Sequence, residues 1–507
     1  MELNFWTSPV RIKSGIDIML PKEKLPLLQH YLHKHKINNF NIIINDVENL
    51  IIERERKNKN IKRRRLADEP INKREEINNK IEEEINFHNY NSYSQMVAWM
   101  RALAKQNPKF VQFISIGKSH EGRGIEGLEI GSRGFRKRAF WIDGGIHARE
   151  WAAPHTALYF IHQLVSRYGK DEEITRLANE ITWIIVPLLN PDGYEFTRSS
   201  TNPNIRLWRK NRSPTHCVRD QWGRNRCCKG VDLNRNFDFH FKESGSSDDP
   251  CSEIYQGKHA FSEPEARAVR DALLSNRYRG RIDGYITLHT YSQIWIHPYG
   301  HKRLENEIFF NFVQFLYLGI AILGMSKIYF LLDKEQRQHL AVFMGQNMLL
   351  EVGLILSSGG SEDWAKESAN IKYVYLLELR PDEKNWDGFI LDERQLMPTA
   401  TETWAGVRVV AEAIIQRARA RRVATIINNN NGSGGNISVG GVKQFTLTDK
   451  TTTINTPEIK KEEEQKIIKS CVDRRRACKR WVKQSEHLCQ SVAIFMADQC
   501  ARSCGFC

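Results

Sequence analysis

Apolar and polar positions follow two rhythms along most of the chain. Short apolar runs typical of buried strands recur between residues 110 and 379: FVQFISIG, GIEGLEI, RAFWIDG, ITWIIVPLL, IDGYITLH and KYVYLLEL. Before, between and after them lie stretches with helical apolar spacing: SYSQMVAWMRALAKQ, HTALYFIHQLVSRY, SEPEARAVRDALLS (opening on a capping-type Ser262) and ETWAGVRVVAEAIIQRA. This alternation predicts an α/β domain over residues 86–420, with a mixed, largely parallel twisted sheet flanked by helices.

The pattern changes on both sides of this domain. Residues 1–65 hold two strand-like runs, GIDIML and FNIIIND, on either side of a helical segment, and predict a small α/β unit. Residues 66–85 are highly charged and indicate a linker. Residues 421–470 are low-complexity and include NNNNGSGGNISVGG, with sequons at Asn431 and Asn436 that fit an exposed linker. Residues 471–507 form a segment too small to hold a core without cross-links.

Composition adds size and charge to this picture. The 507 residues, 41% hydrophobic and 10% aromatic, are enough for two or three globular domains. The formal net charge is +15, but no zinc-finger, RRM or basic-zipper pattern accompanies it, so we expect no nucleic-acid partner. The densest basic cluster, RERKNKNIKRRR at residues 54–65, indicates either a solvated helix or a cleavage site for a trypsin-like activating protease.

Ten cysteines occur in two tight groups. Four lie between Cys217 and Cys251, and six lie in the last 37 residues. Even numbers in compact groups favour disulfides, and therefore an oxidising, extracellular compartment. The opening stretch, MELNFWTSPVRIKSG, has no basic start followed by an apolar core. We therefore expect a secreted protein whose signal peptide precedes the first residue shown.

Candidate metal chemistry begins after the strand RAFWIDG. His147 and Glu150 form an HxxE pair, which is weak evidence by itself because chance matches are common. A third ligand is available in His289, at the end of the strand IDGYITLH, where α/β sheets build their sites. Glu378 lies inside the apolar strand KYVYLLEL, where a carboxylate needs a partner. It is either half of an ion pair with Arg380 or a general base that activates a metal-bound water.

Six ordered motifs turn these observations into a family resemblance. HxxE, LWRKNR, VDLNRNFDF, LHTYSQ, GGSEDW and LLELRP together resemble the zinc metallocarboxypeptidases of the pancreatic A/B type, from residue 86 to about residue 420. Residues 1–65, with FWTSP and DIMLPKEKLPLLQHYL, resemble the inhibitory pro-segment of that family. The resemblance implies a carboxypeptidase-like fold, a zymogen, and removal of C-terminal residues from peptides or proteins.

The resemblance also implies roles for individual residues. One Zn²⁺ per catalytic domain would be held by His147, Glu150 and His289. Glu378 would take a proton from the attacking water and pass it to the leaving amine. Arg212 would stabilise the oxyanion, with Arg209 as the second choice for this role. The substrate would be bound by Asn234 and Arg235 at its terminal carboxylate, by Arg149 one subsite back, and by Tyr291 and Glu362.

Glu362 determines the predicted specificity. The family places the residue that meets the C-terminal side chain of the substrate at this position of GGSEDW, and acidic residues there accompany Lys or Arg. The alternative is that Glu362 points to solvent and that Asp363 determines the specificity. The resemblance also implies a Cys228–Cys251 disulfide, which leaves Cys217 and Cys227 as a neighbouring pair.

The resemblance breaks down between residues 305 and 358. The family places a tyrosine that closes over the substrate at a position equivalent by spacing to Ile355. Residues 308–326 form an uncharged stretch, IFFNFVQFLYLGIAILGMS, of marginal transmembrane length. One crossing would separate His289 from Glu378, so we expect no membrane span. The hypothesis that accounts for the intact flanking motifs is an error in the gene model, such as a retained intron.

The last 37 residues resemble ShKT (ShK toxin-like) modules. The cysteine order and the ending ARSCGFC support this, and the family pairing would be Cys471–Cys507, Cys478–Cys500 and Cys489–Cys504. Spacing alone permits fifteen connectivities. Such a module can tether an enzyme to a target that the sequence does not identify. The alternative function is an inactive peptidase scaffold that binds through this module, but the retained ligands and base favour an enzyme.

Overall fold

The computed structural model describes most of the chain in two compact units, Met1–Ser433 and Gly434–Cys507. The described residues are 4–6, 16–37, 40–56, 85–134, 137–219, 223–299, 330–332, 340–344, 348–352, 357–382, 387–432 and 503. Ile355, residues 308–326, residues 57–84 with the arginines at 63–65, and the six C-terminal cysteines lie outside them. The predictions made for those segments therefore stay predictions.

A ten-stranded mixed sheet forms the centre of the first unit, in the order β11-β12-β13-β10-β14-β9-β5-β6-β4-β3. Its middle strands, β14, β9, β5 and β6, are parallel, while β3 and β4 are antiparallel additions at one edge. The strand bounds are β3 Val111–Lys118, β4 Gly124–Ile130, β5 Ala139–Gly144, β6 Thr182–Val186, β9 Ile282–Ser292, β10 Ile294–His297, β11 Phe330–Leu332, β12 Leu340–Met344, β13 Met348–Val352 and β14 Tyr373–Asp382. The six predicted strands and the mixed α/β class are confirmed.

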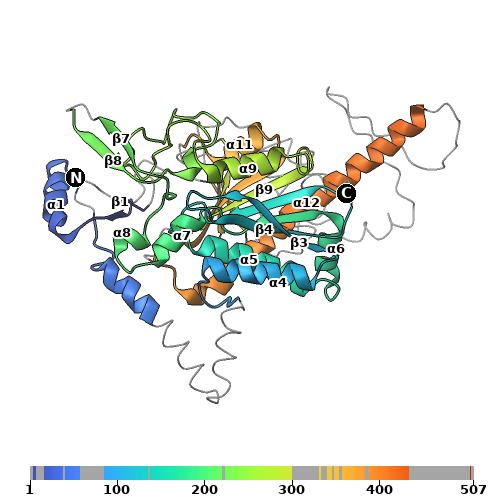
Figure 1. The fold of residues 1–507 in the computed structure, drawn as a ribbon, viewed down its shortest axis with the longest axis horizontal. Helices are drawn as coiled ribbons and strands as arrows, with labels where there is room; N and C mark the ends of the chain where they lie inside the picture. The colour runs from blue at the N-terminus through green and yellow to red at the C-terminus, as the bar shows by residue number, and fades with distance from the viewer. Residues whose placement is uncertain are drawn as a thin grey trace, which may run out of the picture. The chain divides into compact units, whose positions relative to one another are not determined.

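Helices cover both faces of this sheet (Figure 1). One face packs against α4 Tyr93–Gln106, α5 Ala152–Ser166, α6 Glu172–Glu180 and α12 Leu396–Gly432. The other packs against α9 Pro264–Leu274 and α11 Ser361–Glu367. Successive strand residues point to opposite faces, so Phe140 and Ile142 join the first core and Trp141 joins the second. Full burial on both sides explains why these strands are continuously apolar.

Two helix ends differ from the sequence prediction. The first residue before α9 is Glu263, not Ser262, and it makes no side-chain cap; the Ser262 hydroxyl donates to the Glu263 carboxylate instead. Helix α12 continues to Gly432, twelve residues beyond the predicted end of the domain at residue 420. Among the described residues, no helix combines the length and apolarity that a membrane crossing requires.

The N-terminal segment is only partly as predicted. It contains the short strands β1 Asn4–Phe5 and β2 Ile18–Met19, helix α1 Leu25–Lys34 and a helix over residues 47–56. The strand predicted for FNIIIND is wrong, because residues 40–46 pair with no strand in the described structure and Ile42 and Ile43 are 51% and 54% exposed. The following helix packs into the core instead, through Ile51.

A hairpin and three helical turns complete the loops around the sheet ends. Strands β7 His216–Arg219 and β8 Asn225–Cys228 form the hairpin, and the predicted disulfides Cys217–Cys227 and Cys228–Cys251 are both present. The turns that shape the loops beside it are α7 Pro191–Arg198, α8 Pro203–Arg206 and the 3-10 turn η2 Leu233–Arg235. A further 3-10 turn, η3 Glu393–Gln395, leads into α12.

Candidate metal centre and substrate site

Two of the three predicted metal ligands come from the sharp loop that joins β5 to α5. The loop turns at Gly145, whose φ of +61° disfavours a side chain and whose added Cβ would lie 2.5 Å from Leu188 Cδ1. His147 and Glu150 follow this turn and are 3% and 2% exposed. The backbone N–H of Ala148 donates to the Arg209 carbonyl at 2.9 Å, which fixes the loop against the segment 207–211.

The third ligand and the predicted base lie on adjacent parallel strands. His289 is on β9 and Glu378 is on β14, and the two residues are direct register partners. Side chains of such partners point to the same face, so both meet the loop that carries His147 and Glu150. The carboxyl ends of β5, β9 and β14 thus bring together residues that are 231 positions apart, from His147 to Glu378.

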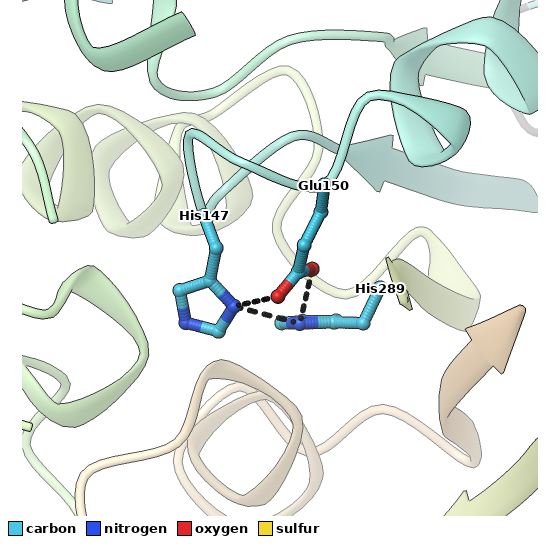
Figure 2. Close-up of side chains that lie close together, drawn as sticks. All are labelled: His147, Glu150 and His289. Atoms are coloured by element: carbon cyan, nitrogen blue, oxygen red, sulfur yellow. Dashed lines mark hydrogen bonds and ion pairs between the residues drawn. The ribbon is translucent and has the colours of Figure 1, made fainter. Parts of the chain in front are cut away.

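The ligand atoms converge in a buried cluster (Figure 2). His147 Nδ1 lies 2.7 Å from Glu150 Oε1 and 3.2 Å from His289 Nδ1, and His289 Nδ1 lies 3.3 Å from Glu150 Oε2. Two imidazole nitrogens that face each other beside a carboxylate form a donor set of the kind that binds Zn²⁺. In the described structure, the buried Oε2 of Glu378 also has no hydrogen-bond partner. These groups therefore fit a metal ion and a polar reactant beside it.

Charges around the cluster favour ionised Glu150. Burial alone would raise its pKa, but His147 and His289 lower it below the ordinary value. Burial and the Arg209 charge lower the pKa of His147, which keeps this imidazole neutral and able to bind a metal. Burial raises the pKa of Glu378 to about 8, although His289 opposes the shift.

Asp232 is a site residue that the sequence prediction missed. Its Oδ1 lies 3.1 Å from His147 Nε2, the ring nitrogen that faces away from the cluster, and its Oδ2 accepts from Arg209 Nε at 3.0 Å. A carboxylate in this position fixes the tautomer and orientation of a ligating histidine. The signal was available, since Asp232 stands two residues before Asn234 in VDLNRN.

The structure corrects the choice between the two arginines of WRKNR. Arg209 Nη1 lies 3.9 Å from Glu150 Oε1, at the cluster. Arg212 turns away: its guanidinium lies 3.6 Å from the centre of the Phe196 ring, and its Nε is 3.8 Å from Glu121 Oε1. The structure therefore does not support Arg212 as the oxyanion-stabilising residue, because Phe196 and Glu121, which its side chain contacts, lie outside the cluster of metal ligands. Arg209, the second choice, is the arginine that faces the metal ligands.

The residues predicted for the terminal carboxylate and the specificity pocket lie together. Asn234 Oδ1 accepts from the Ser361 N–H at 2.8 Å, and its Nδ2 donates to Glu362 Oε2 at 3.3 Å. Arg235 follows in the same turn, and its Nε donates a hydrogen bond to the Gly245 carbonyl at 2.7 Å. Glu362 is 4% exposed, which excludes the alternative that it points to solvent.

The N-terminal segment contacts the two remaining substrate candidates. Arg149 donates to Asn4 Oδ1 and to the Phe5 carbonyl, each at 3.4 Å, and its guanidinium lies 4.0 Å from the centre of the Phe389 ring. The Tyr291 hydroxyl donates to Asp17 Oδ2 at 2.7 Å. Strand β1 and Asp17, the residue before β2, thus occupy groups that a peptide would need.

A second set of contacts fixes this segment to the domain. Arg54, from the helix over residues 47–56, pairs with Asp387 at 2.9 Å and with Asp392. The three side chains are 19%, 8% and 12% exposed, so solvent screens these pairs only in part. A cavity of about 310 Å³ lies beside them, lined by Ile51, Tyr90, Arg206 and Leu391 among others.

Comparison with known proteins gives three family matches along the chain. A family described as zinc carboxypeptidase matches residues 96–406, one described as carboxypeptidase activation peptide matches residues 1–54, and one described as ShK domain-like matches residues 470–507. Carboxypeptidase B of Astacus astacus is 38% identical over 64% of this chain and 97% of its own length. Carboxypeptidase A2 of Mus musculus is 33% identical over 82% of this chain and 88% of its own length.

Solved structures agree with the observed fold. The crystal structure of thrombin activatable fibrinolysis inhibitor is similar with a TM-score of 0.63 and 28% identity, over 82% of this chain and 92% of that one. Carboxypeptidase A from Helicoverpa armigera also has a TM-score of 0.63, with 26% identity and the same coverage.

Proposed function

The chain belongs to the zinc carboxypeptidase family, and from this membership we propose that it is a secreted zymogen that removes C-terminal Lys or Arg from peptides. The observation that carries the proposal is the buried convergence of His147, Glu150 and His289 beside Glu378. An inactive scaffold has no use for three intact ligand side chains and a carboxylate in register with one of them.

We assign the metal to the three-residue cluster and the chemistry to the groups around it. His147, Glu150 and His289 would hold one Zn²⁺, which when bound supplies a Lewis acid that polarises the scissile carbonyl and acidifies water. Glu378 accepts a proton from the attacking water and delivers it to the amine that leaves. Arg209 donates hydrogen bonds to the carbonyl oxygen as it gains negative charge.

Recognition of the peptide end explains the exopeptidase action. The Arg235 guanidinium and the Asn234 amide bind the terminal carboxylate, which only the last residue of a peptide offers. Glu362 lies beside Asn234, so the side chain of that last residue enters a pocket with a buried carboxylate. Desolvation makes such a pocket favour a cation over an apolar side chain, which supports a preference for Lys or Arg. Arg149 and Tyr291 contact the preceding residue.

The contacts of the N-terminal segment support a zymogen. As long as Asn4, Phe5 and Asp17 cover Arg149 and Tyr291, a peptide cannot use these two groups. We infer that a trypsin-like protease cuts the basic run at residues 63–65 and releases the segment. The two disulfides and the ShK-like match support an extracellular location, and the ShK-like module then serves as a tether.

Hydrolysis of two blocked dipeptides, one ending in Arg and one in Phe, tests this function. After trypsin treatment, we expect chelator-sensitive release of Arg in preference to Phe. Release of Phe instead would support a carboxypeptidase but reject the role of Glu362 in selecting Lys or Arg. If folded, zinc-loaded protein releases neither Arg nor Phe, the enzyme hypothesis is rejected in favour of a binding scaffold. Residues 305–358 would then be tested first as the cause of the lost activity.

Two variants of α11 isolate the pocket. Glu362→Ile should lower the ratio of Arg to Phe hydrolysis by at least about 30-fold, equivalent to about 2 kcal/mol, because a buried charge pair is lost. Glu367→Gln removes a carboxylate from the exposed end of the same helix and should leave the ratio unchanged. Equal effects of the two changes would show that general charge, and not the pocket, sets the preference.

A further inference from the structure

A run of arginines in the second half of α12 takes no part in the proposed catalysis. Residues 417–422 read RARARR, and on a helix Arg417 and Arg421 share one face while Arg419 and Arg422 share another. Short Lys/Arg-rich stretches of this kind mark patches that attract polyanions. Arg419 pairs with Glu180 at 2.6 Å, whereas the rest of the run belongs to a larger basic group.

Three further cations stand immediately before three neighbouring strands. Arg138 precedes β5, Arg281 precedes β9 and Lys372 precedes β14. The register pairs Ala139 with Ile282 and Tyr373 with Gly284, so these residues lie side by side at the amino edge of the parallel strands. We call the set of six the basic edge: Arg138, Arg281, Lys372, Arg417, Arg421 and Arg422.

Contacts and like-charge effects show that the strand and helix cations form one patch. Arg138 and Arg421 both donate to Asp283, at 2.6 Å and 3.3 Å, so a single carboxylate is shared by two cations. Burial lowers the pKa of Lys366, and the charges of Lys372 and Arg417 act in the same direction. Positive charge is therefore in excess along the basic edge.

Exposure indicates what kind of polyanion fits. Arg421 has 49% of its side chain exposed, and Arg422 and Lys372 are exposed as well. The exposed large hydrophobic side chains of the described structure lie in residues 5–43, apart from Val218 and Leu274, so none belongs to the basic edge. Binding to single-stranded nucleic acid relies on exposed aromatic rings, and stable membrane binding uses apolar side chains that insert.

We propose that the basic edge binds a linear sulfated polysaccharide. Guanidinium groups match the oxygens of a sulfate as they match those of a phosphate, with paired hydrogen bonds, and a chain of sulfates can follow a row of cations. This binding does not depend on the catalytic proposal, because no residue of the basic edge is a metal ligand, a base or a substrate contact in it.

The basic edge is far from the metal centre. Along β9, Arg281 and His289 are eight residues apart, which corresponds to about 26 Å of strand. Catalytic residues lie toward the carboxyl ends of these strands and the basic edge at their amino ends. A bound polysaccharide therefore leaves the peptide site open, and the enzyme can work while it is held on a sulfated matrix.

Heparin chromatography of the full chain tests the proposal. The variant carries Lys372→Gln, Arg421→Gln and Arg422→Gln together, and the matched control carries Lys118→Gln, Lys229→Gln and Lys258→Gln, three exposed lysines outside the basic edge. Each loses three positive charges, so the two have equal net charge, and circular dichroism checks their folding. We expect the variant to elute at clearly lower salt than the control, with a slope of log Kd against log salt reduced by about 2. Hydrolysis of the Arg dipeptide should not change when heparin is bound.

Two results would overturn the proposal. Equal elution of the variant and the control would mean that heparin responds to net charge and not to the basic edge. Loss of binding to single-stranded DNA or to phosphatidylserine vesicles in the variant, with heparin binding intact, would assign the patch to another class of partner. A variant that fails to fold is replaced by the single change Arg422→Gln, which removes one exposed side chain and is read against Lys258→Gln.

Discussion

At the scale of single residues, the geometry separates the base from the metal ligands. Glu378 is half-buried, has a buried Oε2 without a hydrogen-bond partner in the described structure and lies in register with His289. Glu378→Gln keeps the shape but cannot accept the proton. We expect kcat to fall by about 10³-fold or more, with zinc content and the binding of a competitive inhibitor unchanged. Loss of zinc in this variant would show that Glu378 is a ligand and not the base.

Asp232 gives a second residue-scale prediction, because it orients His147 from behind. Asp232→Asn removes a charge that holds both His147 and Arg209. Zinc affinity, measured by competition with a chelating dye, should fall by about 10- to 100-fold. Asp238→Asn, an exposed aspartate in the next turn of the chain, is the matched control and should keep the original affinity.

The arginines of WRKNR show why residue roles are harder to predict than motifs. The segment has no strand or helix period at Arg209 and Arg212, so spacing does not tell which side chain points inward. The choice is decided by Asp232, 23 residues after Arg209, and by the Phe196 ring that receives Arg212. These are tertiary contacts, whereas the ligand set His147, Glu150 and His289 was implied by the family resemblance, and the described structure brings the three side chains together.

At the scale of elements, the buried strands were predictable and the N-terminal segment was not. Strands β5, β9 and β14 are buried on both faces, so their apolar runs have one interpretation. FNIIIND is equally apolar, but Ile42 and Ile43 stay exposed and no described strand pairs with it. An apolar run becomes a strand only where a partner edge exists, and the sequence does not show such edges.

The helix over residues 47–56 leads to a prediction about activation. Arg54 holds it to Asp387 and Asp392 through partly buried ion pairs. Arg54→Ala leaves two carboxylates without this partner and should weaken the docking of the segment by about 1–2 kcal/mol. We expect the uncut zymogen to gain about tenfold in residual activity, and trypsin to activate it faster.

Arg56→Ala is the control for this change, since Arg56 is exposed on the same helix. It should leave residual activity and activation rate as they are in the unmodified zymogen. If both variants activate alike, the gain reflects a general loss of helix charge, and the contacts of Arg149 and Tyr291 alone would then hold the segment in place.

At the scale of the whole molecule, the metal centre ties together parts of the chain that are distant in sequence. His147 and Glu150 come from the loop after β5, and His289 comes from β9 at the middle of the sheet. A ligand that binds only the folded state stabilises it by about 4 kcal/mol when its free concentration is 1,000 times Kd. Removal of zinc should therefore lower the Tm of the catalytic domain by several degrees.

Two variants make this thermal shift specific to the proposed ligand set. In His289→Ala the Tm should no longer respond to a chelator, because the site has lost one of three ligands. In Glu378→Gln the chelator should still lower the Tm by the same amount, since the base does not hold the metal. A chelator shift that survives in His289→Ala would place the stabilising ion elsewhere, and the cluster of His120, Glu263 and Glu265 would be the next site to change.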